Sequence, residues 1–310
     1  MILNTGSRTD IPAFYSECFY NRVRAGFVLA RHPYYPSRVT RYQISPDVVD
    51  AIVFCSKNPE PMFDQLSLLE PFTTFWFVSI TPYGPEVEPR VPNKDRVADS
   101  FCRLSELVGP EHMSWRYDPV FISRTYTIDA HIEEFGHLAR RLRDSTTQCV
   151  VSFIDLYEKT RRNFPEVSTV TPREQEELVA AFADIAQQNG MHIHLCCENP
   201  QLTRPGVDAT GCLSSHVLEE AIGAPLRVPA HKPARPECNC LLGADIGAYN
   251  TCNHGCRYCY ANYDLSSVRR NMARHDPTSP LLIGNLEAGD VVKDAQQTSW
   301  IDPQPTIFEL

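Results

Sequence analysis

The stretch 171–196, TPREQEELVAAFADIAQQNGMHIHLC, decides the fold because it joins a well-marked helix to a short apolar strand. Thr171 is placed to cap the helix, and Pro172 suits its first position. Glu174 completes a capping box with Thr171, and Gly190 ends the helix. The pattern therefore predicts a helix over 172–189 followed by a strand over 192–196.

Strands and helices alternate through the first two-thirds of the chain. Apolar residues at helical spacing predict two further helices, at 94–108 and 129–143. Short β-rich runs predict strands at 2–4, 51–55, 74–80, 113–116 and 149–154. Strand–helix units in succession are typical of parallel α/β folds. We therefore predict a TIM-like parallel barrel, complete or partial, over residues 1–223.

The pattern changes after residue 223. Eight of the twelve cysteines lie between residues 196 and 259, and residues 226–245 are rich in proline with no regular period. We expect residues 224–276 to form a metal-bearing, iron–sulfur-binding extension that packs on the mouth of the barrel. Residues 277–310 show no clear period and are expected to be an irregular C-terminal tail.

Composition narrows the possible functions. No apolar run approaches the length of a membrane span, and the first residues lack the pattern of a secretory signal, so a cytoplasmic protein is expected. In such a chain, twelve cysteines favour metal ligation over disulfides. The net charge of −9 disfavours nucleic-acid binding, which depends on neutralising phosphates. Four isolated cysteines in apolar contexts are expected to be buried and inert: Cys18, Cys55, Cys102 and Cys149.

The cysteine triplet, defined as Cys252, Cys256 and Cys259, is the clearest chemical motif. Three thiolates at this spacing can bind three irons of a 4Fe–4S cluster and leave the fourth iron open to a small molecule. Tyr258 precedes the last thiol, and Gly255 allows a tight turn. The pattern resembles the cluster loop of radical-SAM enzymes, in which S-adenosylmethionine binds the open iron. The alternative is a zinc site made by Cys256 and Cys259 with another pair such as Cys238 and Cys240, which would leave Cys252 unused.

The remaining clustered cysteines predict a second metal site. Four thiolates would saturate a second cluster or a zinc ion, and the candidates are Cys196, Cys197, Cys212, Cys238 and Cys240. Neighbouring residues of a strand point to opposite faces, so we expect only one of the first two to join a given site. His192 and His194 share the face of Cys196 and are expected to pack or to form hydrogen bonds, although a ligand role stays open.

Polar residues follow the predicted strands, at the end of a barrel where reacting groups are found. We expect these residues to position a substrate: Arg8, Asp10, Lys57, Asn58, Arg116, Asp118, Asp155 and Tyr157. The simpler alternative is that pairs such as Arg8 with Asp10, or Arg116 with Asp118, only tie loops together.

Five segments resemble the domain-of-unknown-function family 1848, and the resemblance runs from Ser7 to about Gly284. They are Ser7-Arg-Thr-Asp-Ile-Pro-Ala-Phe-Tyr15, Phe54-Cys-Ser-Lys-Asn-Pro59, Trp115-Arg-Tyr-Asp-Pro119, Ser152-Phe-Ile-Asp-Leu-Tyr157 and Asp245-Ile-Gly-Ala-Tyr-Asn-Thr-Cys252. That family is described as radical-SAM-like iron–sulfur proteins with a cysteine triplet near the C-terminus. The resemblance implies that Cys196, Cys212, Cys238 and Cys240 are ligands. It also implies that Cys197, which replaces an alanine, is not.

One departure concerns the site for S-adenosylmethionine. Radical-SAM enzymes usually carry Gly-Gly-Glu on the second strand to hold the methionyl amine, where this chain has Cys55-Ser-Lys57. Lys57 or Arg8 could hold the methionyl carboxylate as a charge-assisted partner. The amine would then need Asp10, Asp118 or Glu198, so Glu198 is placed with Asn58 and Tyr258 among the expected cofactor-binding residues.

The resulting hypothesis is a radical-SAM-type enzyme with catalytic residues Arg8, Asp10, Lys57, Arg116, Asp118, Asp155 and Tyr157. Its open iron would cleave S-adenosylmethionine reductively to abstract hydrogen from an unidentified small molecule or side chain. An electron donor such as a flavodoxin or ferredoxin is the expected partner. One alternative is a DNA-repair enzyme similar to photoproduct lyases, invited by Tyr260-Ala-Asn262. Another is a non-enzymatic scaffold or sensor stabilised by metal.

Overall fold

A parallel β-sheet of eight strands forms the centre of the protein, as shown by a computed structural model that describes residues 1–230, 238, 240–241 and 243–303. The order across the sheet is β10-β1-β4-β5-β6-β7-β8-β9. The strands are β1 (Ile2–Asn4), β4 (Ala51–Ser56), β5 (Thr74–Ser79), β6 (Met113–Val120), β7 (Gln148–Phe153), β8 (His192–Leu195), β9 (Val207–Asp208) and β10 (Ala244–Asp245). The predicted parallel α/β fold is thereby confirmed.

The two edge strands leave the sheet open. Every neighbouring pair is parallel, but within the described residues β9 and β10 do not pair with each other or with a further strand that would close the ring. A closed TIM barrel is therefore not found. Strand β10 comes from the predicted extension, so the cysteine-rich part of the chain joins the main sheet directly beside β1. Residues 231–237, 239 and 242 of that extension lie outside the described residues.

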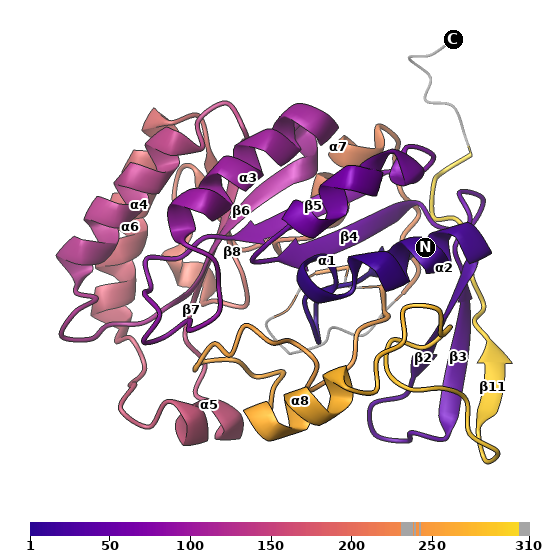
Figure 1. The fold of residues 1–310 in the computed structure, drawn as a ribbon. Helices are drawn as coiled ribbons and strands as arrows, with labels where there is room; N and C mark the ends of the chain where they lie inside the picture. The colour runs from indigo at the N-terminus through magenta and orange to yellow at the C-terminus, as the bar shows by residue number, and fades with distance from the viewer. Residues whose placement is uncertain (231–237, 239, 242, 304–310) are drawn as a thin grey trace, which may run out of the picture.

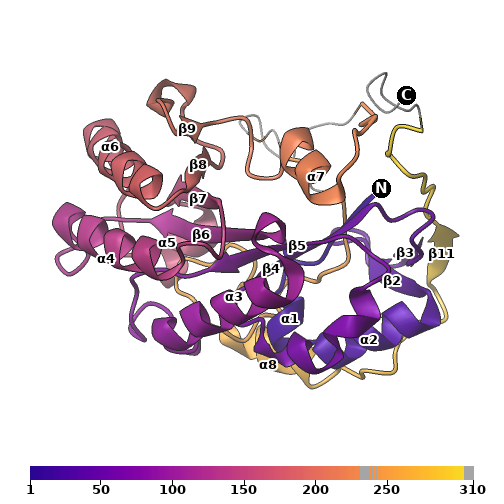
Figure 2. The same ribbon diagram turned by 90° about the horizontal axis from the view of Figure 1, so that it is seen from above.

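Helices pack on both faces of the sheet, as Figures 1 and 2 show. In Figure 2 the sheet separates α7 from helices α1 to α3. The α-helices are α1 (Ile11–Phe14), α2 (Ser16–Ala25), α3 (Lys94–Val108), α4 (Ile128–Arg141), α5 (Glu158–Asn163), α6 (Pro172–Gln188), α7 (Ser215–Ile222) and α8 (Leu265–Met272). Short 3₁₀ helices are η1 (Glu60–Leu69), η2 (Pro110–His112) and η3 (Pro200–Leu202). The capping box predicted for α6 is present.

Alternate residues of each strand build two separate cores. On β4, Ile52 and Phe54 belong to the large core under α1 to α4 and α6, where the Phe54 ring stacks on Trp76 at 4.0 Å between centroids. Val53, on the opposite face, belongs to a smaller core with Phe77 and residues of α7. The smaller core also contains cysteines, so the face of the sheet that α7 covers is where the metal-binding candidates gather.

A second sheet brings a segment near the C-terminus beside the first part of the chain. It has the order β11-β3-β2, with β2 (Phe27–Arg31), β3 (Arg38–Gln43) and β11 (Val291–Asp294). Strand β11 lies within residues 277–310, where the sequence showed no period, and residues 304–310 lie outside the described part. Asp50 accepts a hydrogen bond from Trp300 and pairs with the Met1 amine. Within the described residues, no helix is long and apolar enough to cross a membrane.

Candidate functional site

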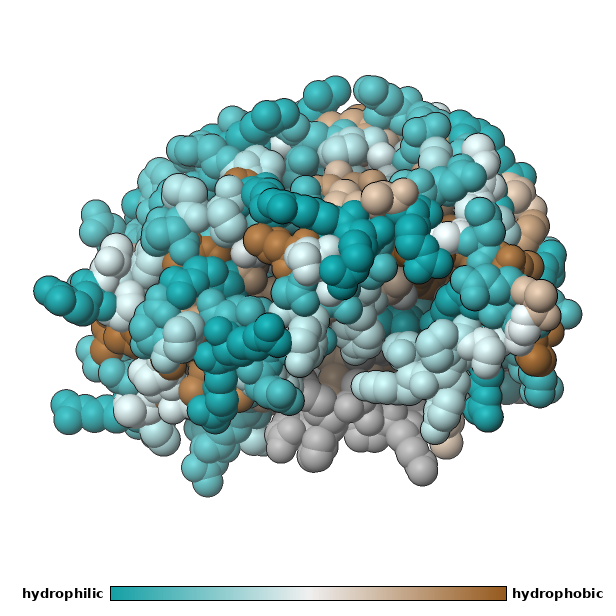
Figure 3. Space-filling model, turned by 60° about the horizontal axis from the view of Figure 1, so that its bottom comes forward, coloured by the Kyte–Doolittle hydropathy of each residue, from teal (hydrophilic) through white to brown (hydrophobic). Residues whose placement is uncertain are grey.

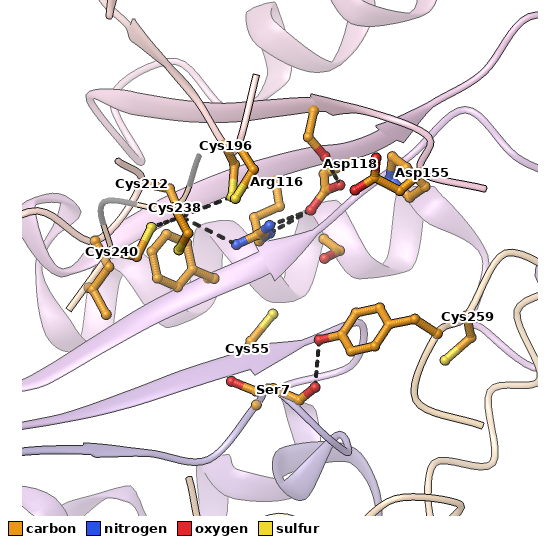
Figure 4. Close-up of a pocket in the computed structure, with 18 of the residues that line it drawn as sticks. Ser7, Cys55, Arg116, Asp118, Asp155, Cys196, Cys212, Cys238, Cys240 and Cys259 are labelled. Atoms are coloured by element: carbon orange, nitrogen blue, oxygen red, sulfur yellow. Dashed lines mark hydrogen bonds and ion pairs between the residues drawn. The ribbon is translucent and has the colours of Figure 1, made fainter. Parts of the chain in front are cut away.

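A cavity of about 500 Å³ opens at the carboxyl ends of the central strands. Its walls include strand-end residues such as Ser79, Asp118 and Ser152, and it reaches Cys259 of the triplet loop. Figure 4 shows Cys196, Cys212, Cys238 and Cys240 grouped at one end, Arg116 and Asp118 between, and Cys259 set apart from the group. One cavity therefore contacts both groups of predicted metal ligands.

The second cysteine set, defined as Cys196, Cys212, Cys238 and Cys240, is closely gathered. The Sγ of Cys212 lies 3.5 Å from that of Cys196 and 3.3 Å from that of Cys240. These three sulfurs all lie within 4.8 Å of one another, and Cys238 lines the same end of the cavity. Zn–S bonds of about 2.3 Å place two thiolates of a tetrahedral ion about 3.8 Å apart, close to the observed spacing. The set can therefore hold a metal ion.

Cys197 lies with this set, contrary to the expectation that it would face away. Strand β8 ends at Leu195, and the backbone of Cys197 is left-handed, with φ of 59°. The alternation of a strand therefore does not extend to Cys197, which lines the cavity together with Cys196. The argument from opposite faces was wrong because the strand stops one residue before the pair.

The thiols of the second cysteine set form hydrogen bonds with one another, and these bonds shift their pKa values. Hydrogen bonds from Cys197, Cys212 and Cys240 lower the pKa of Cys196. The hydrogen bond with Cys196 contributes most to raising the pKa of Cys212. One thiolate can thus be stabilised by its neighbours, but ionisation of the whole set requires a cation among the sulfurs.

Arg116 connects the second cysteine set to the centre of the cavity. Its Nη1 lies 3.8 Å from the Sγ of Cys212, and its Nε lies 3.1 Å from a carboxylate oxygen of Asp118. Asp118 also accepts a hydrogen bond from Ser152. The predicted pair of Arg116 and Asp118 exists; both residues lie on β6, beside the thiols and the cavity.

The triplet loop has a different geometry. Gly255 adopts φ of +73°, which glycine tolerates best, between the first two cysteines. Backbone groups of Ala261 and Asn262 hydrogen-bond to Cys259, as expected for a sulfur that carries negative charge as a ligand. The triplet is not among the groups of described residues whose ligand atoms all lie within 4.8 Å of one another. Thiolates on separate irons of a cubane are also farther apart than thiolates on one ion, so the wider spacing is compatible with a cluster.

Burial controls the charge of the triplet. It raises the pKa of Cys252, Cys256 and Cys259, because a thiolate loses hydration in this position. Neutral thiols are therefore favoured until a cation binds. A bound metal would supply the missing positive charge and convert the thiols to ligands.

A network of charged groups borders the triplet. Glu88 accepts hydrogen bonds from Lys57 at 2.9 Å and Thr81 at 2.8 Å, and it also accepts one from the hydroxyl of Tyr258. Burial alone would lower the pKa of Lys57, but Glu88 and Cys256 raise it. Lys57 therefore stays cationic beside the second cysteine of the triplet.

Asp10 fixes the triplet loop to the sheet. One carboxylate oxygen accepts hydrogen bonds from the backbone of Ala13 and the hydroxyl of Ser56. The other accepts from the Lys57 backbone and from His254 of the triplet loop, each at 2.8 Å. All four donors point at one buried carboxylate, which therefore acts as a structural hub in this arrangement.

The other expected site residues divide into two groups. Those that line the cavity are Arg116, Asp118, Asp155, Tyr157 and Tyr258, and those outside its lining are Arg8, Asp10, Lys57, Asn58 and Glu198. Arg8 pairs with Asp245 of β10 at 3.0 Å rather than with Asp10. Glu198 accepts a hydrogen bond from the Phe153 backbone, and burial raises its pKa to about 8. Glu198 is thus mainly a neutral acid at pH 7.

Four residues near the site had no predicted role in it. Cys55 was expected to be inert, but it lines the cavity on the same face of β4 as Val53. A Cβ on Gly6 would lie 2.4 Å from the Cβ of Cys55, so this wall requires glycine. Glu88 carried no signal in the sequence, whereas His254 could have been noted because it lies inside the triplet motif.

The surface around the triplet loop is mostly polar. Figure 3 brings forward the side of α5 and α8, where hydrophilic residues predominate and apolar residues form small separate patches. This face therefore has the polar character of an ordinary solvent-exposed surface.

The fold and site together define an α/β protein with a cysteine-lined cavity at the carboxyl end of a parallel sheet. The model of the domain of unknown function DUF1848 matches residues 2–261, and the chain belongs to this family. The resemblance seen in the sequence is thereby confirmed. No curated protein and no solved structure is found to match the chain.

Proposed function

We propose that the protein is an iron–sulfur enzyme of the radical-SAM type, in which the cysteine triplet holds a 4Fe–4S cluster with one open iron. When bound, such a cluster would supply the electron for reductive cleavage of S-adenosylmethionine, with hydrogen abstraction from a substrate as the outcome. The open sheet would then serve as a partial barrel around the reaction. The substrate would be a small molecule or a side chain that enters the cavity.

The observation that carries this proposal is the cavity of about 500 Å³ that touches both Cys259 and the second cysteine set. A volume of this size lies within the range of small-molecule sites. The fit of the triplet to a cluster rests on its partly buried thiols, the backbone hydrogen bonds at Cys259 and the αL turn at Gly255.

Residues of this chain would perform three tasks around the bound groups. Tyr258 and Tyr260 stand on the triplet side of the cavity and would limit access of water. Arg116 and Asp118 would orient a substrate through one positive and one negative group. Lys57 would balance negative charge beside Cys256.

The second cysteine set supports an auxiliary metal site within the same proposal. Its sulfur separations of 3.3 and 3.5 Å support a single ion such as zinc more directly than a second cubane. Arg116 would partly neutralise the charge of the metal–thiolate group. A cytoplasmic electron donor such as a flavodoxin or ferredoxin would reduce the triplet cluster.

Anaerobic reconstitution with iron and sulfide, followed by metal analysis and incubation with S-adenosylmethionine and dithionite, tests the proposal. We expect about four irons on the triplet and release of 5′-deoxyadenosine. Cys259→Ser should abolish that release, whereas Cys102→Ser, on the far side of the sheet, should not. Release of no 5′-deoxyadenosine by a fully loaded protein would reject the enzyme and favour the scaffold. Salt-sensitive binding of DNA would favour the repair alternative.

A further inference from the structure

His192, His194 and Asp208 form a third group of possible metal ligands, outside the cavity lining. Alternation along β8 places the two histidines on one face, and β9 brings Asp208 into register with His194. The three ligand atoms all lie within 4.8 Å of one another. Residues far apart in sequence are thus brought together by strand pairing, as in zinc sites built on sheets.

One carboxylate oxygen of Asp208 faces both rings. Its Oδ2 lies 2.6 Å from Nε2 of His192 and 3.1 Å from Nδ1 of His194. The other oxygen accepts hydrogen bonds from the backbone and hydroxyl of Thr210, at 2.8 and 2.6 Å. Thr210 thereby fixes the orientation of the carboxylate, as outer hydrogen bonds do for metal-binding carboxylates.

His194 presents its buried ring nitrogen to the same carboxylate. The residue is only 8% exposed, and the Asp208 oxygen 3.1 Å from its Nδ1 does not meet the geometry of a directed hydrogen bond. A metal ion between the two atoms would satisfy both of them better than this direct contact does. The ring of His192 is partly exposed, so an ion from solvent can reach the group.

We propose that His192, His194 and Asp208 bind one divalent transition-metal ion of the zinc class. With Zn–N and Zn–O bonds of about 2.0–2.2 Å, ligand atoms would lie about 3–3.5 Å apart. The hydrogen bond of 2.6 Å between His192 and Asp208 therefore has to open slightly, while the separation of 3.1 Å at His194 already fits. Three protein ligands leave one position of a tetrahedral ion for water.

An ion bound at this site would also affect the structure at the edge of the sheet. Strand β9 is a two-residue edge strand, and Asp208 precedes Cys212 by four residues. An ion bound by both strands would fix β9 to β8 and hold the start of the segment that carries Cys212. The site itself depends only on His192, His194 and Asp208, and it is independent of the proposed iron–sulfur chemistry.

Titration of the metal-free, full-length protein with Co²⁺ tests this proposal, because thiolate-bound Co²⁺ has an intense sulfur-to-metal charge-transfer band and a histidine–carboxylate site does not. We expect His194→Ala to lose one equivalent of bound Co²⁺ while keeping the charge-transfer band. Cys212→Ser should weaken that band but keep the one equivalent of Co²⁺ that His192, His194 and Asp208 are proposed to bind. His216→Ala should change neither, since its contact with Glu220 is exposed and lies in α7.

Asp208→Asn keeps the shape of the side chain and decides the outcome if His194→Ala does not fold. It should also lose one equivalent, or bind it at least about tenfold more weakly. Full wild-type stoichiometry in a folded His194→Ala or Asp208→Asn protein would overturn the proposal. Loss of only the sulfur-bound Co²⁺ in these variants would also overturn it.

Discussion

The two cysteine regions at the ends of the cavity differ in how they are assembled. The triplet is held by eight consecutive residues that turn at Gly255, whereas the second set joins β8, the segment after β9 and the segment before β10. In the second set, sulfurs lie as close as 3.3 Å and three of them lie within 4.8 Å of one another, whereas the three triplet sulfurs do not all lie within that distance. The chemistry of a local motif such as the triplet can be recognised from the spacing of its residues in the sequence. A dispersed site acquires its geometry only when the sheet forms.

The largest expected effect separates the two regions by their metals. Cys256→Ser should remove about four irons and the visible absorbance of the reconstituted protein, because a cubane needs all three thiolates of the triplet. The same variant should keep the metal of the second set. Cys212→Ser should do the reverse, since Cys212 is the sulfur that contacts both Cys196 and Cys240. Metal analysis together with absorbance measures both outcomes.

Cys102→Ser is the matched control for these variants. Its sulfur contacts a backbone oxygen of Arg141, away from both sites, so full metal content is expected. If either Cys256→Ser or Cys212→Ser empties both sites together in a folded protein, the two regions form one unit and the comparison fails.

A smaller effect should follow from Asp10→Ala. The change removes four hydrogen bonds that join the triplet loop, α1 and the end of β4. Leaving these donors without a partner should lower the free energy of unfolding by about 2–4 kcal/mol. Chemical denaturation of the metal-free protein measures the change, and iron loading of the triplet should fall more than metal loading of the second set.

Asp264→Ala is the control for that prediction. Asp264 also caps a helix, α8, but its side chain bonds locally to Ser266 and Ser267 on the surface. Its removal should lower the free energy of unfolding by less than Asp10→Ala does, because only local hydrogen bonds at an exposed helix end are lost. Equal losses for the two variants would show that Asp10 is a cap and does not hold the triplet loop.

The smallest effect concerns the scaffold that both regions share. Burial lowers the pKa of His131, whose ring lies between the hydroxyl of Tyr117 and the backbone of Phe121, each at 2.9 Å. As pH falls below about 6.5, the unfolded chain binds a proton before the folded protein does, so the free energy of unfolding should decrease. The slope should approach about 1 kcal/mol per pH unit.

His131→Gln should reduce this slope in the metal-free protein, at the cost of lower stability at pH 7. Chemical denaturation between pH 5.5 and 7.5 measures how the free energy of unfolding depends on pH. His216→Gln, at an exposed histidine, is the control, and it should leave that dependence as in the wild-type protein. An unaltered slope in His131→Gln would assign the scaffold's acid sensitivity to other groups.

Local signals in the sequence predicted much of the central sheet. Strand 2–4 and helix 94–108 match β1 and α3, and the predicted helix at 172–189 ends one residue beyond α6. These elements carry strong apolar periods or caps, which act within a few residues. Periodicity therefore gave the parallel α/β class without any knowledge of tertiary contacts.

Elements that depend on distant partners could not be predicted in this way. Strands β9 and β10 have two residues each, too few for a period, and β11 forms only because β3 lies beside it. The open edges of the sheet follow from such pairings. For the same reason, the sequence could not distinguish a closed barrel from an open sheet.

The candidate site was predictable to a similar extent. Spacing identified the triplet, and Cys196, Cys212 and Cys240 do converge. The face of Cys55 could not be known, because alternation along β4 does not say which side of the sheet holds the cavity. The place of Cys197 depended on a left-handed backbone angle at the end of β8.

The dispersed origin of the second cysteine set has a consequence for biosynthesis. Cys196 and Cys240 are separated by 43 intervening residues, and β8 must pair before Cys196 takes its place. During translation, a metal ion could not be bound by all of these cysteines until Cys240 had been synthesised and β8 had paired with the rest of the sheet. Metal binding at this site would therefore occur late in folding, and a chain in which β8 had not paired correctly would not bind the ion.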